Sequence, residues 1–522
     1  MILSSSFSKI AIRLSPRDPL AVARCDIPAG SLVRADDPAL PFTTFTVGQA
    51  IPAGHKLAIR PIACGEEVLR YGHPIGVATQ AIAPGDWIHT HNLSVGNMQR
   101  GFSRQVVEIE RAASDCKQTF LGYPRPNGQA GTRNLIAVVA TVSCAAQTAR
   151  AIAHAFSAKS LAAYPHVSGI VAITHSLGCC SPLDSLSQRY LQRTLYNLAI
   201  HPNIGGALYV SLGCEGNQMG DLLAPLQAPA GNTIRHPLLG PFLAIQECGG
   251  IQKTVTAGVE AIQALLPLVN HTERAPLPLS RLVVALQCGG SDGWSGVTAN
   301  PLVGNVADRL VAQGGSVVLA ETPEIYGAEQ LLACRVASEN VGQALAERLR
   351  WWQEHARQNG FNLDSNPSPG NKAGGLTTIY EKSLGAMAKG GRTPLVQVLA
   401  YGERVTTPGL VFMDTPGYDP ASVTGQVAGG CNLVLFTTGR GTVFGGSVAP
   451  CIKIASNTPM YRRMHADMDF NAGAILDGQN MNEAAQALLA QAVQIASGMP
   501  TQSERSLFRE AEFVPWHLGG ML

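Results

Sequence analysis

The sequence predicts an α/β protein in which a small all-β domain precedes two α/β domains built on parallel sheets. The first 95 residues hold short apolar runs separated by turn sequences such as PAGS, PAGH and APGD, a pattern typical of a small β module. From Gly122 onward, continuous β-branched runs alternate with helical segments, as in parallel sheets covered on both faces. The chain has 522 residues, more than one hydrophobic core usually serves.

We expect four segments along the chain: a β module at 1–95, a linker at 96–118, a second domain at 119–272 and a C-terminal domain at 273–522. The second domain is predicted from the runs NLIAVVATV, SGIVAITHS and GGALYVSLG, each followed by a helical or turn-rich segment. The C-terminal domain is predicted from RLVVALQCGG, SVVLAETPE, GLVFMDTPG, NLVLFTTGRG and CIKIASNT. Together these runs predict about eight strand–turn–helix units.

Composition excludes several classes of function. The net charge is +2, with 14% charged residues, and the absence of a Lys/Arg block argues against nucleic acid as a partner. The sequence has no uninterrupted apolar run long enough to span a membrane. Its first residues show no cleavable leader pattern, so we expect a cytosolic protein. Twelve cysteines in so long a chain are too few for a secreted disulfide scaffold, and we expect most to be buried thiols.

Polar, charged or thiol side chains follow nearly every predicted strand. In open α/β sheets, ligands bind beyond the carboxyl ends of the strands. We therefore expect these eight ends to form one active-site crevice: Thr141–Cys144, His175–Cys179, Gly213–Asn217, Gln287–Asp292, Glu321, Asp414, Thr437–Arg440 and Ser456–Thr458.

The motif DWIHTHNL ends the β module and holds two histidines two residues apart. On a strand, His89 and His91 project from one face, which suits binding of one metal ion. His55 and His73 lie in the same module and could complete the ligand set. The alternative is a pair of exposed polar side chains at a strand end.

The run NLVLFTTGRGTVFGG ends a buried strand in two hydroxyls and one arginine between glycines. The planar guanidinium of Arg440 matches a carboxylate, and the glycines let an anion approach backbone N–H groups. Thr437 and Thr438 add hydroxyl donors, and Lys453 adds charge one strand later. These residues predict a pocket for a small carboxylate.

Other candidates carry two interpretations each. Arg133 precedes a predicted strand and is either an anion ligand or a surface charge. His175 is either a reactive group or a core histidine. Glu381 and Lys382, in NKAGGLTTIYEKSLG, are either functional or an ordinary solvated pair.

Several long motifs resemble the altronate and galactarate dehydratase family: GYPRPNGQAGTRN, TVSC, NPSPGNKAGGLTTIYEKSLG, FTTGRGTVFGG and DFNAG. IPAGHKLAIRPI, RYGHPIG and WIHTHNL resemble the SAF-type β-clip domain that precedes the core in that family. The likeness covers nearly the whole chain. Ala386 and the HSLGCC segment depart from the pattern expected of relatives, which leaves the substrate open.

The resemblance implies a sugar-acid hydro-lyase that converts a 2,3-dihydroxy acid into a 2-keto-3-deoxy acid, with altronate as the first substrate and galactarate as the second. It implies a divalent metal, Fe²⁺ first and Mn²⁺ or Mg²⁺ as alternatives. The expected roles are metal ligation by His55, His89 and His91, carboxylate binding by Arg133, Thr437, Thr438, Arg440 and Lys453, and proton transfer by His175, Glu381 and Lys382.

Three other functions remain open at this point. The same scaffold resembles sulfo-lyases acting on sulfolactate, in which β-clip and core lie on separate chains. A sugar-acid-binding protein without catalysis is the second. The third is an iron–sulfur dehydratase using Cys144, Cys179 and Cys214, although no CxxC spacing supports it. We expect a small-molecule substrate and a homo-oligomer, a dimer first.

Overall fold

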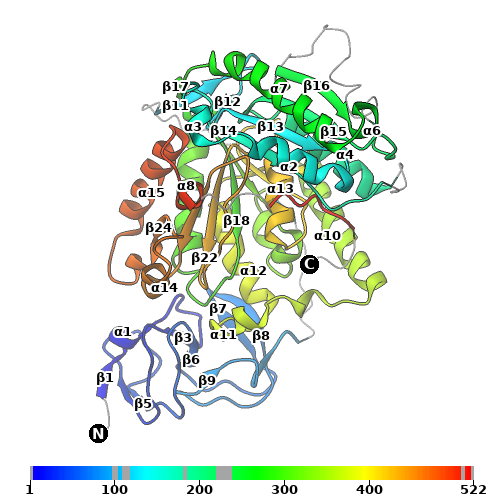
Figure 1. Cartoon of the computed structure of the whole chain (residues 1–522). Coiled ribbons are helices and arrows are strands. Elements are labelled where there is room, and N and C mark those ends of the chain that lie inside the picture. Colours follow the sequence, from blue (N-terminus) through cyan, green and yellow to red (C-terminus); the bar gives the residue numbers. More distant parts are fainter. Residues whose placement is uncertain are drawn as a thin grey trace.

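The computed structural model describes residues 4–96, 104–107, 118–179, 185–218, 238–506 and 512–518. It shows an N-terminal β domain at one end of the molecule, a second domain at the other and the C-terminal domain between them (Figure 1). The predicted fold class is therefore confirmed. The predicted linker, 96–118, lies mostly outside the described residues; within 104–107, Val106 forms a β-bridge with Val336.

The N-terminal domain is built from ten short strands and one helical turn. Three small sheets have the strand orders β2-β3-β6-β9, β1-β4-β5 and β10-β8-β7. Short strands between tight turns follow from the PAG and APG sequences, whose glycines Gly30, Gly54 and Gly85 have φ of 77°, 82° and 91°. The elements are β1 Ser4–Ser6, α1 Phe7–Ile10, β2 Ala11–Ile12, β3 Leu20–Ala23, β4 Leu32–Arg34, β5 Thr44–Thr46, β6 Lys56–Ala58, β7 Glu67–Arg70, β8 His73–Ala78, β9 Trp87–Ile88 and β10 Leu93–Ser94.

The second domain holds a four-stranded parallel sheet of order β14-β13-β15-β16. Every residue of β13 and β15 is buried, as expected for strands covered on both faces. The strands are β13 Leu135–Ala140, β14 Gly169–Ile173, β15 Ile204–Ser211 and β16 Leu238–Ala244. The described helices are η1 Ser143–Ala145, α2 Ala146–His154, α3 Ala158–Leu161, α4 Leu186–Ala199, α6 Ile245–Cys248 and α7 Ile251–Asn270.

The C-terminal domain holds a seven-stranded parallel sheet of order β20-β21-β19-β18-β22-β23-β24. Its strands are β18 Val283–Cys288, β19 Ser316–Leu319, β20 Leu395–Leu399, β21 Leu410–Met413, β22 Leu433–Thr438, β23 Cys451–Ala455 and β24 Phe470–Asn471. Its helices are η2 Leu279–Arg281, α8 Ala299–Ala312, η3 Thr322–Ile325, α9 Gln330–Ala333, α10 Glu339–Asn359, η4 Leu363–Ser365, α11 Pro369–Ala373, α12 Ile379–Met387, η5 Ala388–Gly390, α13 Asp419–Ala428, α14 Thr458–Arg463, η6 Ala472–Ile475, α15 Met481–Ala496 and α16 Gln502–Ser506.

A small antiparallel sheet, β12-β11-β17, connects the two α/β domains. It consists of β11 Thr119–Pro124, β12 Ala130–Gly131 and β17 Ala275–Pro278. The α/β domains also share a hydrophobic core, in which Leu135 and Val139 of β13 cluster with Val434 and Phe436 of β22. They are therefore two sheets in one packed body.

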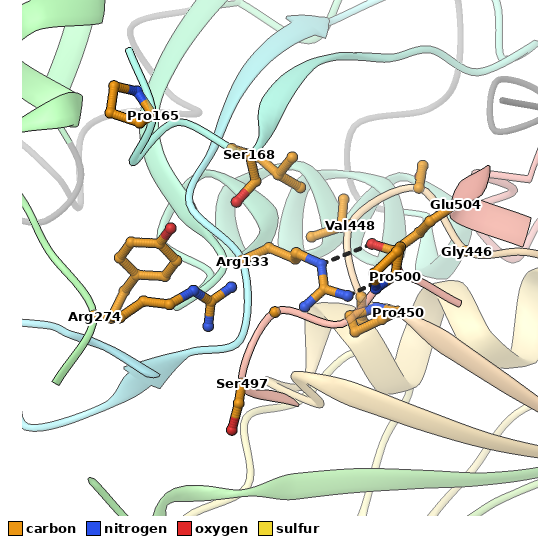
Figure 2. Close-up of a pocket in the computed structure, with 15 residues that line it drawn as sticks. Arg133, Pro165, Ser168, Arg274, Gly446, Val448, Pro450, Ser497, Pro500 and Glu504 are labelled. Carbon is orange, nitrogen blue, oxygen red and sulfur yellow. Dashed lines mark hydrogen bonds and ion pairs between the residues drawn. The ribbon is translucent and has the colours of Figure 1, made fainter. Parts of the chain in front are cut away.

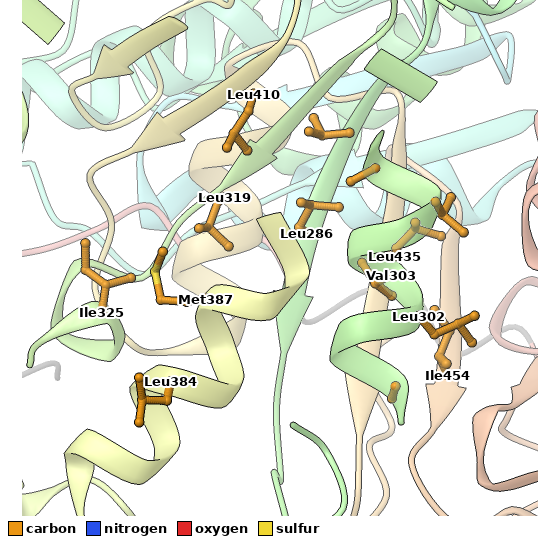
Figure 3. Close-up of a cluster of buried hydrophobic side chains, with 14 of the residues drawn as sticks. Leu286, Leu302, Val303, Leu319, Ile325, Leu384, Met387, Leu410, Leu435 and Ile454 are labelled. Atoms are coloured by element: carbon orange, nitrogen blue, oxygen red, sulfur yellow. The ribbon is translucent and has the colours of Figure 1, made fainter. Parts of the chain in front are cut away.

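The other face of the large sheet packs on helices that position the site. Leu286, Leu435 and Ile454 lie against Leu302 of α8, and Leu384 of α12 belongs to the same cluster (Figure 3). This burial fixes α12 beside the carboxyl end of the sheet. Among the described residues, no helix is long and apolar enough to cross a membrane.

Candidate active site

The eight polar strand ends divide between the two sheets, so the expectation of one shared crevice is wrong. The ends at Thr141–Cys144, His175–Cys179 and Gly213–Asn217 follow β13, β14 and β15 of the second domain. The other five follow strands of the C-terminal sheet, whose carboxyl edge faces α12 and the N-terminal domain (Figure 1). Sequence runs do not reveal which strands share a sheet, and the two sheets occupy different parts of the molecule.

Five reactive side chains meet at the carboxyl edge of the large sheet, and we call them the edge cluster: Cys288, Glu321, Glu324, Lys382 and Lys389. Cys288 ends β18, Glu321 follows β19, and Glu324 lies in η3. Lys389 Nζ lies 2.8 Å from Cys288 Sγ and 3.5 Å from a Glu321 oxygen. Lys382 Nζ pairs with Glu324 and donates to Asn366 Oδ1 at 2.8 Å. All five side chains are buried.

The two glutamates of the edge cluster have opposite pKa shifts. Burial, together with the neighbouring Glu324, raises the pKa of Glu321 to about 8. Burial also opposes ionisation of Glu324, but Lys382 outweighs it and lowers the pKa of Glu324. Burial raises the pKa of the Cys288 thiol to about 12. At Glu321, burial and the Glu324 carboxylate therefore outweigh the attraction of Lys389, and a bound cation beside Glu321 would favour its ionised form.

Glu321 has two further features typical of functional positions. Its φ is 67°, which costs a non-glycine residue on the order of 1–3 kcal/mol and is most often retained at functional sites. Its Oε1 is buried without a hydrogen-bond partner among the described residues. Glu321, Glu324 and Cys288 offer ligand atoms within 4.8 Å of one another. These three residues form a possible metal-binding triad.

Glu381, the neighbour of Lys382 on α12, faces the N-terminal domain. Both of its oxygens lie 2.9 Å from Lys56 Nζ, and Arg70 pairs with it as well. Thr377 donates its backbone N–H and its hydroxyl to the same carboxylate. Burial opposes its ionisation, but Lys56 and Arg70 hold its pKa at about 2. This fully buried group joins two domains, and its predicted role in proton transfer stays a prediction that the geometry does not favour.

The histidines of the N-terminal domain contact α11 of the C-terminal domain. His55 Nε2 donates to Ala373 O at 3.3 Å, and its Nδ1 accepts from Trp87. His89 Nε2 donates to Lys372 O at 3.0 Å, and its Nδ1 accepts from the Thr90 N–H. Burial lowers the pKa of His89 to about 4, so this imidazole is neutral.

These hydrogen bonds occupy both ring nitrogens of His55 and of His89. His91 is exposed, with its ring 5.5 Å from that of Trp87. The three imidazoles are neighbours, but the structure gives two of them hydrogen-bonding roles at the domain interface. Metal ligation by His55, His89 and His91 stays a prediction.

The predicted carboxylate pocket is only partly assembled. Thr437 and Thr438 end β22 and are buried, with Thr437 Oγ1 donating to Asn300 Oδ1 at 2.6 Å and Thr438 Oγ1 accepting from the Gly441 N–H at 3.0 Å. Arg440 is exposed and passes beside Gly290 and Gly374. Since His55 and His89 bind α11 just before Gly374, Arg440 and the histidines approach the same segment.

Lys453 and Arg133 do not join Arg440. Lys453 is buried in the middle of β23 opposite Phe436, so its side chain is on the sheet face opposite to Thr437. Arg133 lies before β13, where all five guanidinium donors are used: it forms a two-point pair with Glu504 and donates to three backbone carbonyls.

The Arg133–Glu504 pair borders a cavity of about 420 Å³ between the two α/β domains (Figure 2). Arg274 lies in the same cavity, over the ring of Tyr123 at 4.5 Å, and donates to the carbonyls of Leu121, Thr132 and Ala496. Because both arginines already have acceptors, the cavity offers little to an anion. The pair stabilises the domain junction, and substrate binding by Arg133 and Lys453 stays a prediction.

His175 follows β14 in the second domain, whereas Glu381 and Lys382 lie on α12 of the C-terminal domain. Burial lowers the pKa of His175 to about 4. The structure therefore separates this histidine from the two residues with which it was grouped, and its catalytic role stays a prediction.

Five residues of the site were not predicted from the sequence: Cys288, Glu324, Lys389, Lys56 and Arg70. Cys288 and Glu321 follow predicted strands, and that position was the available signal. Lys56 and Arg70 belong to short β strands in which a charge normally faces water. Lys389 carries no local signal, because only the packing of η5 against α8 brings it to the cluster.

Comparison with protein families matches three consecutive parts of the chain. Residues 9–96 match the altronate/galactarate dehydratase SAF domain. Residues 122–270 match the D-galactarate dehydratase/altronate hydrolase second domain. Residues 279–521 match the D-galactarate/altronate dehydratase C-terminal domain.

Several characterised proteins are similar over most of the chain. An altronate dehydratase of Escherichia coli is 36% identical over 504 residues, covering 96% of this chain and 97% of that protein. A galactarate dehydratase (L-threo-forming) of Escherichia coli is 35% identical over 436 residues, or 83% of each chain. The (2R)-sulfolactate sulfo-lyase subunit beta of Chromohalobacter salexigens is 31% identical over 398 residues, covering 75% of this chain and 96% of that subunit.

Proposed function

This chain belongs to the D-galactarate/altronate dehydratase family, and we propose that it is a hydro-lyase that dehydrates a sugar acid to the 2-keto-3-deoxy acid. One observation carries this proposal: similarity to an altronate dehydratase extends over 96% of the chain. All three family domains are present in the same order. The edge cluster supplies paired carboxylates and ammonium groups, which such chemistry needs.

We propose altronate as the first substrate and galactarate as the second. Similarity to the altronate dehydratase covers 504 residues, against 436 for the galactarate dehydratase, at nearly equal identity. The longer match at nearly equal identity is the observation that supports altronate.

We propose that the Cys288–Glu321–Glu324 triad holds the divalent metal that the family resemblance implies, with Fe²⁺ first. The donor set fits: two carboxylates suit Fe²⁺, Mn²⁺ or Mg²⁺, and a thiolate suits iron. The partnerless Glu321 Oε1 and the raised pKa of Glu321 both fit a carboxylate that binds a cation. When bound, the ion would stabilise the negative charge that develops on the substrate carboxylate as the C2 proton leaves.

The two lysines of the edge cluster are the proposed proton carriers. Lys389 contacts Cys288 and Glu321, and Lys382 contacts Glu324. Burial opposes the charge of both lysines, but Glu324, Cys288 and Glu321 outweigh it and raise both pKa values. Each lysine is therefore an ammonium, which would donate a proton to the departing 3-hydroxyl.

Arg440 is the proposed carboxylate ligand. It is exposed at the end of β22, and no hydrogen bond or ion pair of its guanidinium occurs with any other described residue. Its five donors are therefore available for two-point binding of a carboxylate.

A sulfo-lyase acting on sulfolactate is the second candidate. The subunit beta relative matches 75% of this chain, and a separate subunit alpha of the same organism is 49% identical over 49 residues, or 9% of this chain. Here both regions lie in one polypeptide, as in the dehydratase relatives, and this arrangement favours the hydro-lyase. A non-catalytic binding protein is disfavoured by the reactive groups of the edge cluster.

The test is anaerobic turnover with Fe²⁺, Mn²⁺ or Mg²⁺ and a panel of aldonates, aldarates and sulfolactate. We expect metal-dependent 2-keto-3-deoxy acid from altronate. Sulfite release from sulfolactate would transfer the assignment to the sulfo-lyase. Binding of sugar acid without any product would identify a binding protein. Light scattering of the same preparation tests the predicted homodimer.

A further inference from the structure

Every strand of the second-domain sheet is followed by a cysteine at its carboxyl end. Cys144 lies in η1 after β13, Cys179 follows β14, Cys214 follows β15, and Cys248 ends α6 after β16. These strands are neighbours in the order β14-β13-β15-β16, all parallel. The four thiols therefore gather along one edge of one sheet, away from the edge cluster of the C-terminal domain.

Three of the four loops converge over the end of β13. The Ser143 N–H, next to Cys144, donates to Leu177 O at 3.0 Å, and the Gly216 N–H donates to the carbonyl of Cys179 at 2.9 Å. The loop after β14 thus reaches across β13 to the loop after β15, which is not its neighbour in the sheet. These contacts bring together the loops that carry Cys144, Cys179 and Cys214.

The same loops also hold two polar side chains with a partnerless atom. His175 Nε2 and Asn217 Oδ1 are buried without a hydrogen-bond partner among the described residues. The two side chains are only 7% and 5% exposed. Buried polar atoms are nearly always paired with protein, water or a bound group, so these two atoms are available to such a group in this loop cluster.

The accessibility and spacing of the thiols indicate the kind of occupant. Cys144 and Cys214 are exposed and Cys179 is half-buried, so all three are reachable. Within the described ranges, only Cys288, Glu321 and Glu324 bring three candidate ligand atoms within 4.8 Å of one another. The three second-domain thiols do not meet this limit, and an iron–sulfur cluster does not require it, because its cysteines bind different irons.

We propose that Cys144, Cys179 and Cys214 bind a [4Fe–4S] cluster at the carboxyl edge of the second-domain sheet. Three thiolates hold three irons and leave one iron without a cysteine. Cys248 lies one strand further along the sheet and stays outside the cluster. The inference rests on the second domain alone and does not depend on the proposed dehydratase site.

The test is anaerobic reconstitution of the full-length protein with ferric iron, sulfide and dithiothreitol, which reduces part of the iron, followed by removal of unbound metal. We expect broad visible absorbance near 400 nm and about four irons and four acid-labile sulfides per chain. Single changes Cys144→Ser, Cys179→Ser and Cys214→Ser should each lower bound sulfide several-fold. Cys64→Ser, an exposed cysteine of the N-terminal domain, is the matched control and should retain full loading.

Three results would overturn the proposal. One is reconstituted wild-type protein without acid-labile sulfide, including protein that binds only a single iron or zinc ion. Another is equal sulfide content in the three serine variants and in Cys64→Ser. The third is a disulfide between any two of the three cysteines in protein purified without oxygen, shown by thiol counting. Circular dichroism of each variant identifies any loss that results from unfolding.

Discussion

Glu321 is the residue on which the proposed metal site depends most. It combines a left-handed backbone, a partnerless buried oxygen and a raised pKa. Glu321→Gln removes one charged ligand but preserves size, so we expect the fold to persist and activity to fall at least about 100-fold. Bound iron, measured by mass spectrometry after desalting, should fall in parallel. Glu347→Gln, on the exposed face of α10, is the matched control.

The histidine ligand set makes a competing prediction for the same measurement. If His89 and His91 hold the ion, the double variant His89→Ala/His91→Ala loses metal while Glu321→Gln keeps it. The edge-cluster account expects the opposite order. Full iron loading in Glu321→Gln would therefore exclude the triad.

Arg440 should act on substrate binding more than on the chemical step. A charged, two-point hydrogen bond contributes about 1.5–3 kcal/mol, so we expect Arg440→Gln to raise KM roughly 10- to 150-fold. The kcat should change little, because the lost interaction stabilises ground state and transition state alike. Arg350→Gln, another exposed arginine, should leave both constants unchanged. A large fall in kcat at constant KM would instead place Arg440 at the reacting atoms.

Residues at the ends of strands could be predicted from the sequence, but which side chains form ion pairs with one another could not. Glu321, Thr437 and Arg440 follow strands whose apolar runs are unmistakable, so their placement could be predicted. Lys389 and Glu324 could not, because their pairing depends on how η5 and η3 pack beside β18. Arg133 was predicted as an anion ligand because Glu504, its actual partner, lies 371 residues later in the sequence.

Helix α12 is the element that links the N-terminal domain to the active site. Its N-cap, Thr378, accepts from the Glu381 N–H at 3.3 Å, and its next two side chains point to different partners. Glu381 binds Lys56 and Arg70 of the N-terminal domain, and Lys382 binds Glu324 of the edge cluster. Docking of the β domain therefore fixes the position of a proposed catalytic lysine.

Removing the charge of Glu381 should destabilise this interface strongly. Glu381→Gln leaves Lys56 and Arg70 buried without a counter-charge, which typically costs about 3–5 kcal/mol. We expect a loss of that size in the free energy of unfolding, measured by denaturant titration. Glu66→Gln breaks the half-exposed pair with Arg60 and should cost no more than about 1 kcal/mol. Equal losses of unfolding free energy in the two variants would contradict a stabilising role for the buried Glu381–Lys56–Arg70 group.

The same carboxylate predicts a pH dependence of stability. Burial opposes ionisation of Glu381, but Lys56 and Arg70 lower its pKa to about 2 in the folded protein, against 4.5 for an ordinary glutamate. A lowered carboxyl pKa stabilises the fold above pH 4.5 and loses this contribution as pH falls toward 2, by about 3 kcal/mol in total. Between pH 5 and pH 3, unfolding midpoints should therefore fall more steeply for wild type than for Glu381→Gln. Parallel slopes would show that the carboxyl titrates normally.

At the scale of the whole molecule, the order of domains was readable from sequence, but their assembly was not. Short apolar runs separated by turn sequences identified the N-terminal β domain, and continuous apolar runs identified the parallel sheets. Runs alone do not show that β13–β16 and β18–β24 form separate sheets joined by one core, because strand order is set by tertiary packing. That difference divided the predicted crevice into the edge cluster and the row of cysteines.

The most direct measurement of the central claim is NMR of wild-type turnover of altronate in D₂O. A hydro-lyase removes the C2 proton, expels the 3-hydroxyl as water and takes a solvent proton at C3 when the enol becomes the ketone. For the proposed hydro-lyase, we expect 2-keto-3-deoxy acid with one deuterium at C3 from every turnover. Product that carries the original C2 hydrogen at C3, or no keto acid from any sugar acid with iron present, would contradict it.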